Sequence, residues 1–177
     1  MPFILEAWTD GACRRNGYPD AVGGAGVWFP RYPPGNRAEP LPQLPPPTSS
    51  RAELTAIILA LEAVNEKQEQ ICAGNNFPPF FHVTINSDSE YSVKCLNGWI
   101  LDWIQNGWRT YDNRPVINSD LIFQAHNLRL EIEGAFKGAR ITFNQVSRAE
   151  NVTADQLAND GCDKAERELQ GIQNGFY

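Results

Sequence analysis

The chain has 177 residues, 42% of them hydrophobic, which suits one domain with a core of its own. Its formal net charge of −6 excludes a broadly basic nucleic-acid-binding surface, so any such site must be local. Four cysteines without C-x-x-C spacing argue against a zinc site or disulfide scaffold and favour a reducing, intracellular compartment. Because the N-terminus lacks a basic leader and its apolar run is short, we expect no signal peptide and no membrane span.

In chain order, the sequence first predicts three strands, at about 3–10, 22–29 and, more weakly, 36–42. The third strand falls in a proline-rich stretch, with eight prolines between Pro30 and Pro47. Because proline cannot donate to a strand ladder, we expect a stiff hairpin insertion at about 30–47 with at most an edge strand inside it. A proline-rich docking ligand is the alternative interpretation of this stretch.

A helix at about 50–70 is the clearest element. Its apolar residues recur on one face at helical spacing: Leu54, Ile57, Ile58, Leu61 and Val64. The remaining elements are a strand at about 80–87, helices at about 89–97, 99–106 and 119–133, a strand at about 139–146 and a helix from about 152. This order predicts an α/β fold in a single domain, residues 1–177, with a mixed five-stranded sheet flanked by helices.

Four acidic residues stand at the ends of these elements: Asp10, Glu53, Asp88 and Asp155. Asp10 closes the apolar run of the first strand, and Asp88 closes that of the fourth. Glu53 and Asp155 fall in the first turns of helices. Singly, each has a structural explanation as a turn former, a helix-dipole partner or, for Glu53, a capping box with Ser50. Together they indicate a two-metal nuclease, because side chains at element ends can converge and carboxylates bind divalent cations.

The four carboxylates also lie inside longer motifs, at residues 8–17, 48–54, 86–91 and 151–158. In this order the motifs resemble type 1 ribonuclease H, the enzyme that cuts RNA in RNA/DNA hybrids. Residues 97–110 resemble the substrate-gripping helix and loop of that family, and the resemblance spans about residues 3–165. It implies the ribonuclease H-like fold, in which three antiparallel strands are continued by parallel strands.

The resemblance implies an endonuclease that hydrolyses the RNA strand of a hybrid by two-metal-ion catalysis, leaving 5′-phosphate and 3′-hydroxyl ends. Two Mg²⁺ ions are the implied cofactors, with Mn²⁺ as a substitute. Asp10 would bridge both ions. Glu53 and Asp88 would hold the ion nearer the leaving group, and Asp155 the ion that activates water. We expect the protein to act as a monomer.

The resemblance further implies which residues bind the hybrid. They are Asn16, Ser49 and Ser50 for the minor groove, Thr48 and Asn118 for a phosphate of the DNA strand, and Tyr91 and Trp99 for the DNA backbone. The family commonly has Asn or Gln where Ser49 and Ser50 stand, which predicts looser selectivity for hybrids. Core packing is the alternative for the tryptophans, and we expect it for Trp103.

Positive charge near these motifs comes from six residues: Arg14, Arg15, Arg51, Lys94, Arg109 and Arg114. We expect them to supply a local basic site, although scattered surface charges would give the same pattern. Asp102 and Gln105 occupy the gripping segment where basic residues would help. With the net charge of −6, this predicts modest hybrid affinity that falls steeply with salt.

One departure from the family concerns residues 145–151. Bacterial and animal members usually place a catalytic-loop His in this loop, which here contains none. Gln145 stands near that place, and Arg148 or Glu150 would substitute in part. An ordinary loop ion pair is the alternative reading of those two residues.

Two rival functions follow from the same residues. The missing His and the low basicity favour a catalytically weak or inactive hybrid-binding or scaffold module on the same fold. The four carboxylates oppose it, because clustering like charges is costly without a metal. The DEDD 3′–5′ exonucleases, on a related fold, need Asp-x-Glu on the first strand, whereas Ala12 follows Asp10 and Gly11 here.

Overall fold

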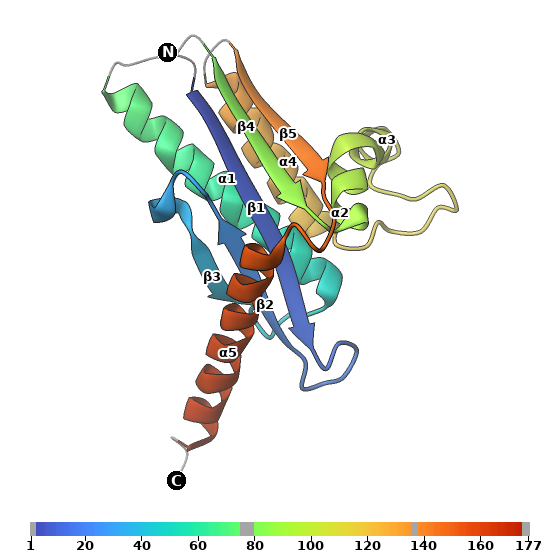
Figure 1. Cartoon of the computed structure of the whole chain (residues 1–177). Helices are drawn as coiled ribbons and strands as arrows, with labels where there is room; N and C mark the ends of the chain where they lie inside the picture. The colour runs from blue at the N-terminus through green and yellow to red at the C-terminus, as the bar shows by residue number, and fades with distance from the viewer. Residues whose placement is uncertain (1–2, 75–79, 136–137, 175–177) are drawn as a thin grey trace.

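Figure 1 shows the computed structural model, which describes residues 3–74, 80–135 and 138–174. Its sheet has the strand order β3-β2-β1-β4-β5. The strands are β1 (Phe3–Arg14), β2 (Val22–Trp28), β3 (Arg37–Pro40), β4 (Phe81–Ser87) and β5 (Ala139–Gln145). β2 pairs antiparallel with β1 and β3, and β4 pairs parallel with β1 and β5. The predicted mixed five-stranded sheet is thus confirmed.

Helices cover the sheet unequally. Behind it in Figure 1 lie α1 (Ser49–Ala73) and α4 (Ser119–Gly134), while α5 (Val152–Asn174) crosses the front of β1 and β2. The predicted apolar face of α1 forms much of the core: Leu54, Ile57, Ile58, Leu61 and Val64 are buried. Within the described ranges, every helix is too short or too polar to cross a lipid bilayer.

The position of α5 depends on a close approach to β2. A Cβ atom added to Gly26 would lie 2.3 Å from the carbonyl oxygen of Ala154, so only glycine lets the helix backbone rest directly on this strand. Gly26 is also the register partner of Asp10 on β1. The contact therefore sets the first turn of α5, which carries Asp155, over the middle of β1.

A segment beyond β4 projects from the sheet. It consists of α2 (Glu90–Lys94), the π-helical turn η2 (Cys95–Trp99), α3 (Ile100–Gln105) and the loop 106–117, at the right of Figure 1. The two helices expected here are joined through η2 rather than separated. The Asn97 side chain donates a hydrogen bond of 2.9 Å to the Phe143 carbonyl of β5, which anchors the segment to the sheet.

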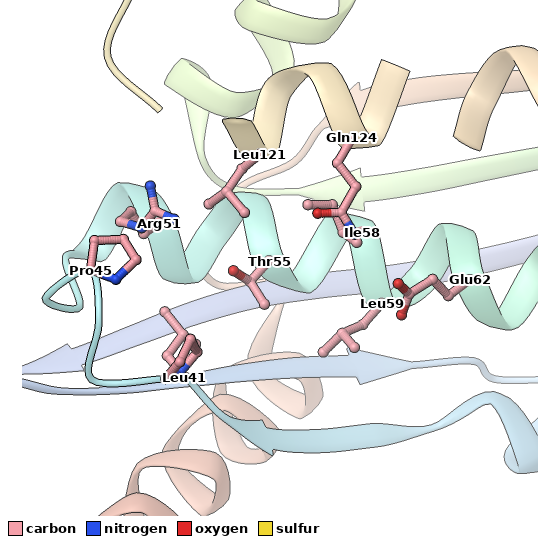
Figure 2. Close-up of a pocket in the computed structure, with 10 residues that line it drawn as sticks. Leu41, Pro45, Arg51, Thr55, Ile58, Leu59, Glu62, Leu121 and Gln124 are labelled. Atoms are coloured by element: carbon pink, nitrogen blue, oxygen red, sulfur yellow. The ribbon is translucent and has the colours of Figure 1, made fainter. Parts of the chain in front are cut away.

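The proline-rich stretch lies against α1. It contains a 3-10 turn, η1 (Pro33–Gly35), and β3, which is the edge strand of the sheet. Figure 2 shows Leu41 and Pro45 from this stretch facing Thr55 of α1 across a pocket of about 210 Å³. At one end of the pocket Arg51 forms an ion pair of 2.7 Å with Asp120 of α4. These contacts fix the start of α1.

Candidate metal and catalytic site

Asp10 lies inside β1, so the expectation that the strand ends near this residue is wrong. β1 continues to Arg14 because its backbone keeps pairing with β2, up to the register pair Arg14↔Val22. Asp10 is only 5% exposed. A buried carboxylate in the middle of a strand costs free energy unless a charge or hydrogen bond compensates for it.

Glu53 reaches Asp10 from α1. The helix begins at Ser49, and its N-cap is Thr48, whose side chain accepts a hydrogen bond of 3.2 Å from the Arg51 N–H. The capping box between Ser50 and Glu53 considered above is therefore wrong, because Ser50 is the second residue of the helix and Thr48 is its N-cap. A Cβ added to Gly11 would lie 2.1 Å from the Glu53 backbone nitrogen, so glycine lets α1 touch β1 at this point.

Asp88 is held by Asn151, a residue to which the sequence analysis assigned no role. The buried side-chain amide of Asn151, 1% exposed, donates to the Thr9 carbonyl at 2.9 Å and to Asp88 Oδ1 at 3.1 Å. It thereby ties the residue before α5 to β1 and to the end of β4. Its own Oδ1 is buried without a hydrogen-bond partner in the described part of the chain. An asparagine directly before a helix was the available signal, but it equally suits a helix cap.

Three carboxylates converge. Asp10, Glu53 and Asp88 each offer an oxygen, and these oxygens lie within 4.8 Å of one another. Asp155 lies close enough to Asp10 for its charge to raise the pKa of Asp10, but it is outside that group of three. Asp155 Oδ1 also lies 3.8 Å from the Arg148 guanidinium. The convergence expected from the sequence is thus met by the triad, with Asp155 at its side.

Burial and crowding perturb two of these acids. Burial, with the Asp88 charge second, raises the pKa of Asp10 to about 7. Burial, followed by the charges of Asp10 and Asp88, raises the pKa of Glu53 to about 9, although a hydrogen bond from the Gly11 backbone opposes the shift. Like charges in a poorly solvated place favour the protonated forms, and a cation would reverse this.

The residues fit a divalent metal. Glu53 Oε2 is buried and lacks a hydrogen-bond partner among the residues described, so an acceptor is available. The donor set of the triad is carboxylate oxygen alone, which suits hard cations such as Mg²⁺ or Mn²⁺ better than zinc.

Several expected substrate contacts lie together near the start of α1. Asn118 has a left-handed backbone, φ 59°, and its Oδ1 accepts a 3.5 Å hydrogen bond from the Arg51 guanidinium. Its amide donates to the Tyr91 hydroxyl at 3.4 Å. Since the Arg51 backbone also binds Thr48, one arginine connects both residues expected to hold a phosphate.

Aromatic rings continue from Tyr91 along the projecting segment. The ring centroids of Tyr91 and Trp99 lie 6.4 Å apart, and those of Trp99 and Trp103 lie 5.8 Å apart. Trp99 is 41% exposed, whereas Trp103 is partly buried against the core, as expected.

The residues expected to contact the minor groove are not joined by hydrogen bonds to the residues expected to hold the phosphate, where the chain is described. Asn16 is exposed in the turn after β1, Ser49 is exposed, and Ser50 is half-buried. Where the chain is described, no side-chain hydrogen bond joins them to Thr48 or Asn118.

The two loop residues considered in place of a catalytic His differ. Glu150 accepts hydrogen bonds from the Ser147 N–H at 3.0 Å and the Ser147 hydroxyl at 2.7 Å, and the hydroxyl contact lowers its pKa. It is thus engaged within its own loop. Arg148 is 84% exposed and faces Asp155. Of the two, Arg148 is placed beside the carboxylates.

The expected basic residues are mostly neutralised by neighbouring acids. Ion pairs join Arg14 to Asp163 (2.7 Å), Arg15 to Asp20 (2.9 Å), Arg51 to Asp120 (2.7 Å), Lys94 to Glu90 (2.5 Å) and Arg114 to Asp112 (2.6 Å). Arg109 instead donates to the Asn113 carbonyl at 2.9 Å. The expectation of a local basic site from these six cations is therefore not supported.

Comparison with known proteins bears on this site. A family model described as RNase H matches residues 4–163. The ribonuclease H of Halorhodospira halophila is 36% identical over 91% of this chain and 94% of its own length. LC9-RNase H1, a solved type 1 RNase H, shares the fold with a TM-score of 0.68 and 23% identity, covering 93% of this chain and 74% of that one.

LC11-RNase H1, solved in complex with an RNA/DNA hybrid, has a TM-score of 0.59 and 21% identity, and the match covers 91% of this chain and 98% of that one. At this identity the two structures support the fold alone, whereas the family model and the curated relative extend over nearly the whole chain. The resemblance drawn from the motifs is thereby confirmed, and the chain belongs to the RNase H family of metal-dependent endoribonucleases.

Proposed function

We propose that this protein hydrolyses the RNA strand of RNA/DNA hybrids by two-metal-ion catalysis. The observation that carries the proposal is the triad of Asp10, Glu53 and Asp88, brought within 4.8 Å from three different elements. Like-charge crowding of this kind, with a buried Glu53 oxygen that has no hydrogen-bond partner in the described residues, is explained by a cation bound during function.

Each carboxylate receives a role within this proposal. Asp10, which borders both Asp88 and Asp155, would bridge two Mg²⁺ ions. Glu53 and Asp88 would hold the ion on the leaving-group side, and Asp155 the ion on the water side. When bound, the ions would supply an activated water and neutralise charge on the phosphate. The products would carry 5′-phosphate and 3′-hydroxyl ends, and Mn²⁺ would substitute for Mg²⁺.

The hybrid is the proposed substrate because curated relatives bear the name ribonuclease H and LC11-RNase H1 was solved with such a hybrid. Thr48 and Asn118, linked through Arg51, would hold a phosphate of the DNA strand. Tyr91 and Trp99 would contact its backbone. Asn16, Ser49 and Ser50 remain proposals for the minor groove.

Arg148 is the proposed auxiliary residue rather than Glu150. Its guanidinium lies 3.8 Å from Asp155, so it can hold that carboxylate when the ion is absent and attract phosphate when substrate arrives. We further propose that the protein acts as a monomer, and its four free cysteines suit a reducing intracellular compartment.

A hybrid-binding module without catalysis is the second candidate. The missing loop His and the ion pairs on the expected basic residues favour it. The strained carboxylate triad disfavours it, because binding alone gives no reason to keep Glu53 and Asp10 in a buried, repulsive arrangement.

A cleavage assay on a labelled RNA/DNA hybrid, with and without Mg²⁺, separates the two candidates. Single-stranded RNA and both homoduplexes serve as controls, and the end groups of the products are mapped. We expect Mg²⁺-dependent cuts within the RNA strand of the hybrid only, with 5′-phosphate ends. A folded protein that binds the hybrid but leaves it intact with Mg²⁺ and with Mn²⁺ would support the binding module.

A further inference from the structure

The projecting segment contains a pocket of which the proposed function uses only Trp99, as a contact to the DNA backbone. Its volume is about 350 Å³, and it is lined by Trp99, Asp102, Trp103, Gln105, Asn106 and Tyr111. This volume lies at the lower end of the range of small-molecule sites, roughly 300–1,000 Å³. Two indole rings, a carboxylate and two side-chain amides in this lining supply both a stacking surface and hydrogen-bonding groups.

Tyr111 stands on a stiff hairpin beside this pocket. The Thr110 N–H donates to the Arg114 carbonyl at 2.8 Å, and the Asn113 N–H donates to the Thr110 carbonyl at 2.9 Å. The Thr110 hydroxyl and the Asp112–Arg114 ion pair brace the same turn. At its tip the Tyr111 ring is fully exposed, 103%. A rigid support that holds an aromatic ring in water lowers the entropic cost of stacking on a ligand.

The pocket continues the aromatic row that begins next to Asn118. Tyr91 contacts Asn118, Trp99 follows Tyr91, and Trp103 follows Trp99. A strand whose phosphate is held near Asn118 and whose backbone passes Tyr91 therefore leads toward Trp99. Aromatic rows of this kind bind successive unpaired bases of a single strand.

Asp102 determines which base fits. Its exposed carboxylate repels phosphate, so the pocket suits the edge of a base rather than the backbone. Guanine presents two adjacent N–H donors on its Watson–Crick edge, which match the two oxygens of a carboxylate. Thymine presents two carbonyl acceptors around one N–H, and a carboxylate repels them.

We propose that this pocket binds one unpaired base of the DNA strand where that strand extends beyond the hybrid, and that it prefers guanine to thymine. The inference rests on the proposed hybrid substrate. Trp99 and Trp103 form the stacking surface, Asp102 reads the Watson–Crick edge, and Tyr111 covers the bound base.

The test compares short hybrids with blunt ends and with two-nucleotide DNA overhangs of dG or dT, at the 3′ or the 5′ end. Affinity is measured by fluorescence anisotropy in EDTA, so that cleavage does not interfere. For one of the two ends, the dG overhang should bind about three- to tenfold more tightly than the dT overhang and the blunt hybrid. Equal affinity for dG and dT at both ends would overturn the inference.

Variants show whether this pocket is responsible. Tyr111→Ala should bind the blunt hybrid as the parent does but lose most of the gain from the dG overhang. Asp102→Ala removes a charge, so the readout is its dG-to-dT ratio, which should fall to about one. Asp160→Ala, the same charge change on an exposed position of α5, should keep the ratio.

Preference for dG that persists in both Tyr111→Ala and Asp102→Ala would contradict the inference. Circular dichroism confirms that each variant is folded, which is expected because both side chains are exposed. Cleavage of the blunt hybrid by the parent with Mg²⁺ is scored separately. If the overhang has no effect on affinity but the blunt hybrid is still cleaved, the inference about the pocket fails while the proposed function stands.

Discussion

The carboxylate triad and the projecting segment differ in solvent exposure and in how charge is arranged. The triad is shielded and crowded, with Asp10 nearly buried and the pKa of Glu53 raised to about 9. The projecting segment, residues 90–117, is exposed and aromatic, and its cations are largely paired with acids. Positive charge for the substrate would therefore come chiefly from metal ions at the triad, while the segment contributes rings and directed hydrogen bonds.

Asp10→Asn should have the largest effect on the triad. The amide keeps the size of the side chain but removes the charge that would hold both ions. Cleavage should therefore fall by on the order of a thousandfold or more. Hybrid affinity in EDTA should be at least that of the parent, and the thermal midpoint unchanged or higher, because repulsion with Asp88 is relieved. Steady-state cleavage, anisotropy and thermal unfolding measure the three quantities.

Asp160→Asn is the matched control, since Asp160 is exposed on α5, and it should retain parent activity. Parent-level cleavage by folded Asp10→Asn would remove Asp10 from the metal site.

Stability against pH tests the crowding of the triad directly. The pKa values of Asp10 and Glu53, about 7 and about 9, lie above the ordinary values of 3.8 and 4.5. Protonation therefore favours the folded state, and this stabilisation is complete below about pH 4 and is lost as pH rises through about 7 and about 9. In EDTA the free energy of unfolding should drop by several kcal/mol between pH 5 and 9, at about 1.4 kcal/mol per pH unit for each of the two acids while it is protonated only in the folded state.

Mg²⁺ should flatten this profile by stabilising the deprotonated protein at high pH, because ions bind the ionised carboxylates. Urea unfolding at several pH values measures both curves. An EDTA profile that stays level, or rises, from pH 5 to 9 would contradict the shielded, repulsive triad.

Asn151→Ala should weaken the support beneath the triad. The change removes the hydrogen bonds to Asp88 and to the Thr9 carbonyl and leaves that buried carbonyl without this donor. We expect a loss of about 1–3 kcal/mol of stability and roughly tenfold slower cleavage, since Asp88 loses its fixed orientation. Asn65→Ala, which removes only an exposed 3.5 Å contact with Glu69, is the control. Unchanged cleavage and stability in Asn151→Ala would show that Asp88 is positioned without it.

Salt dependence gives the smallest effect and tests whether the basic residues stay paired with their neighbouring acids when the hybrid binds. The sequence alone predicted a steep fall in affinity with salt, but the ion pairs of Arg14, Arg51 and Lys94 change that expectation. Few phosphates would be neutralised by free cations, so the plot of log affinity against log salt should be shallow, with a slope near −2 or −3 in EDTA. Anisotropy over a salt series measures it. A slope of about −6 or steeper would show that these cations leave their partners to bind phosphate.

Local patterns in the sequence predicted much of this molecule. The apolar periodicity of Leu54 to Val64 predicted α1, because a core-facing helix needs one continuous apolar face. The order of strands and helices, with the motifs, predicted the sheet and four converging carboxylates, of which Asp10, Glu53 and Asp88 form the close group.

Other features depend on contacts between distant residues, which no local pattern specifies. The continuation of β1 past Asp10 depends on pairing with a glycine-rich β2. Thr48 is the N-cap of α1, although serine is as common as threonine at this position and Ser50 fitted the sequence equally well. The ion pair of Arg14 with Asp163 joins β1 to α5, and the bond from Asn151 to Asp88 joins the segment before α5 to β4. Each requires the assembled fold.

An anomalous difference map from crystals of the parent protein soaked in Mn²⁺ would show directly whether the triad binds a metal ion. We predict a manganese peak coordinated by carboxylate oxygens of Asp10, Glu53 and Asp88, and a second peak near Asp10 and Asp155 when a hybrid with a non-cleavable RNA strand is bound. A fully soaked crystal with an accessible triad and no manganese at Asp10, Glu53 and Asp88, with hybrid present or absent, would contradict the claim that these carboxylates form a metal site.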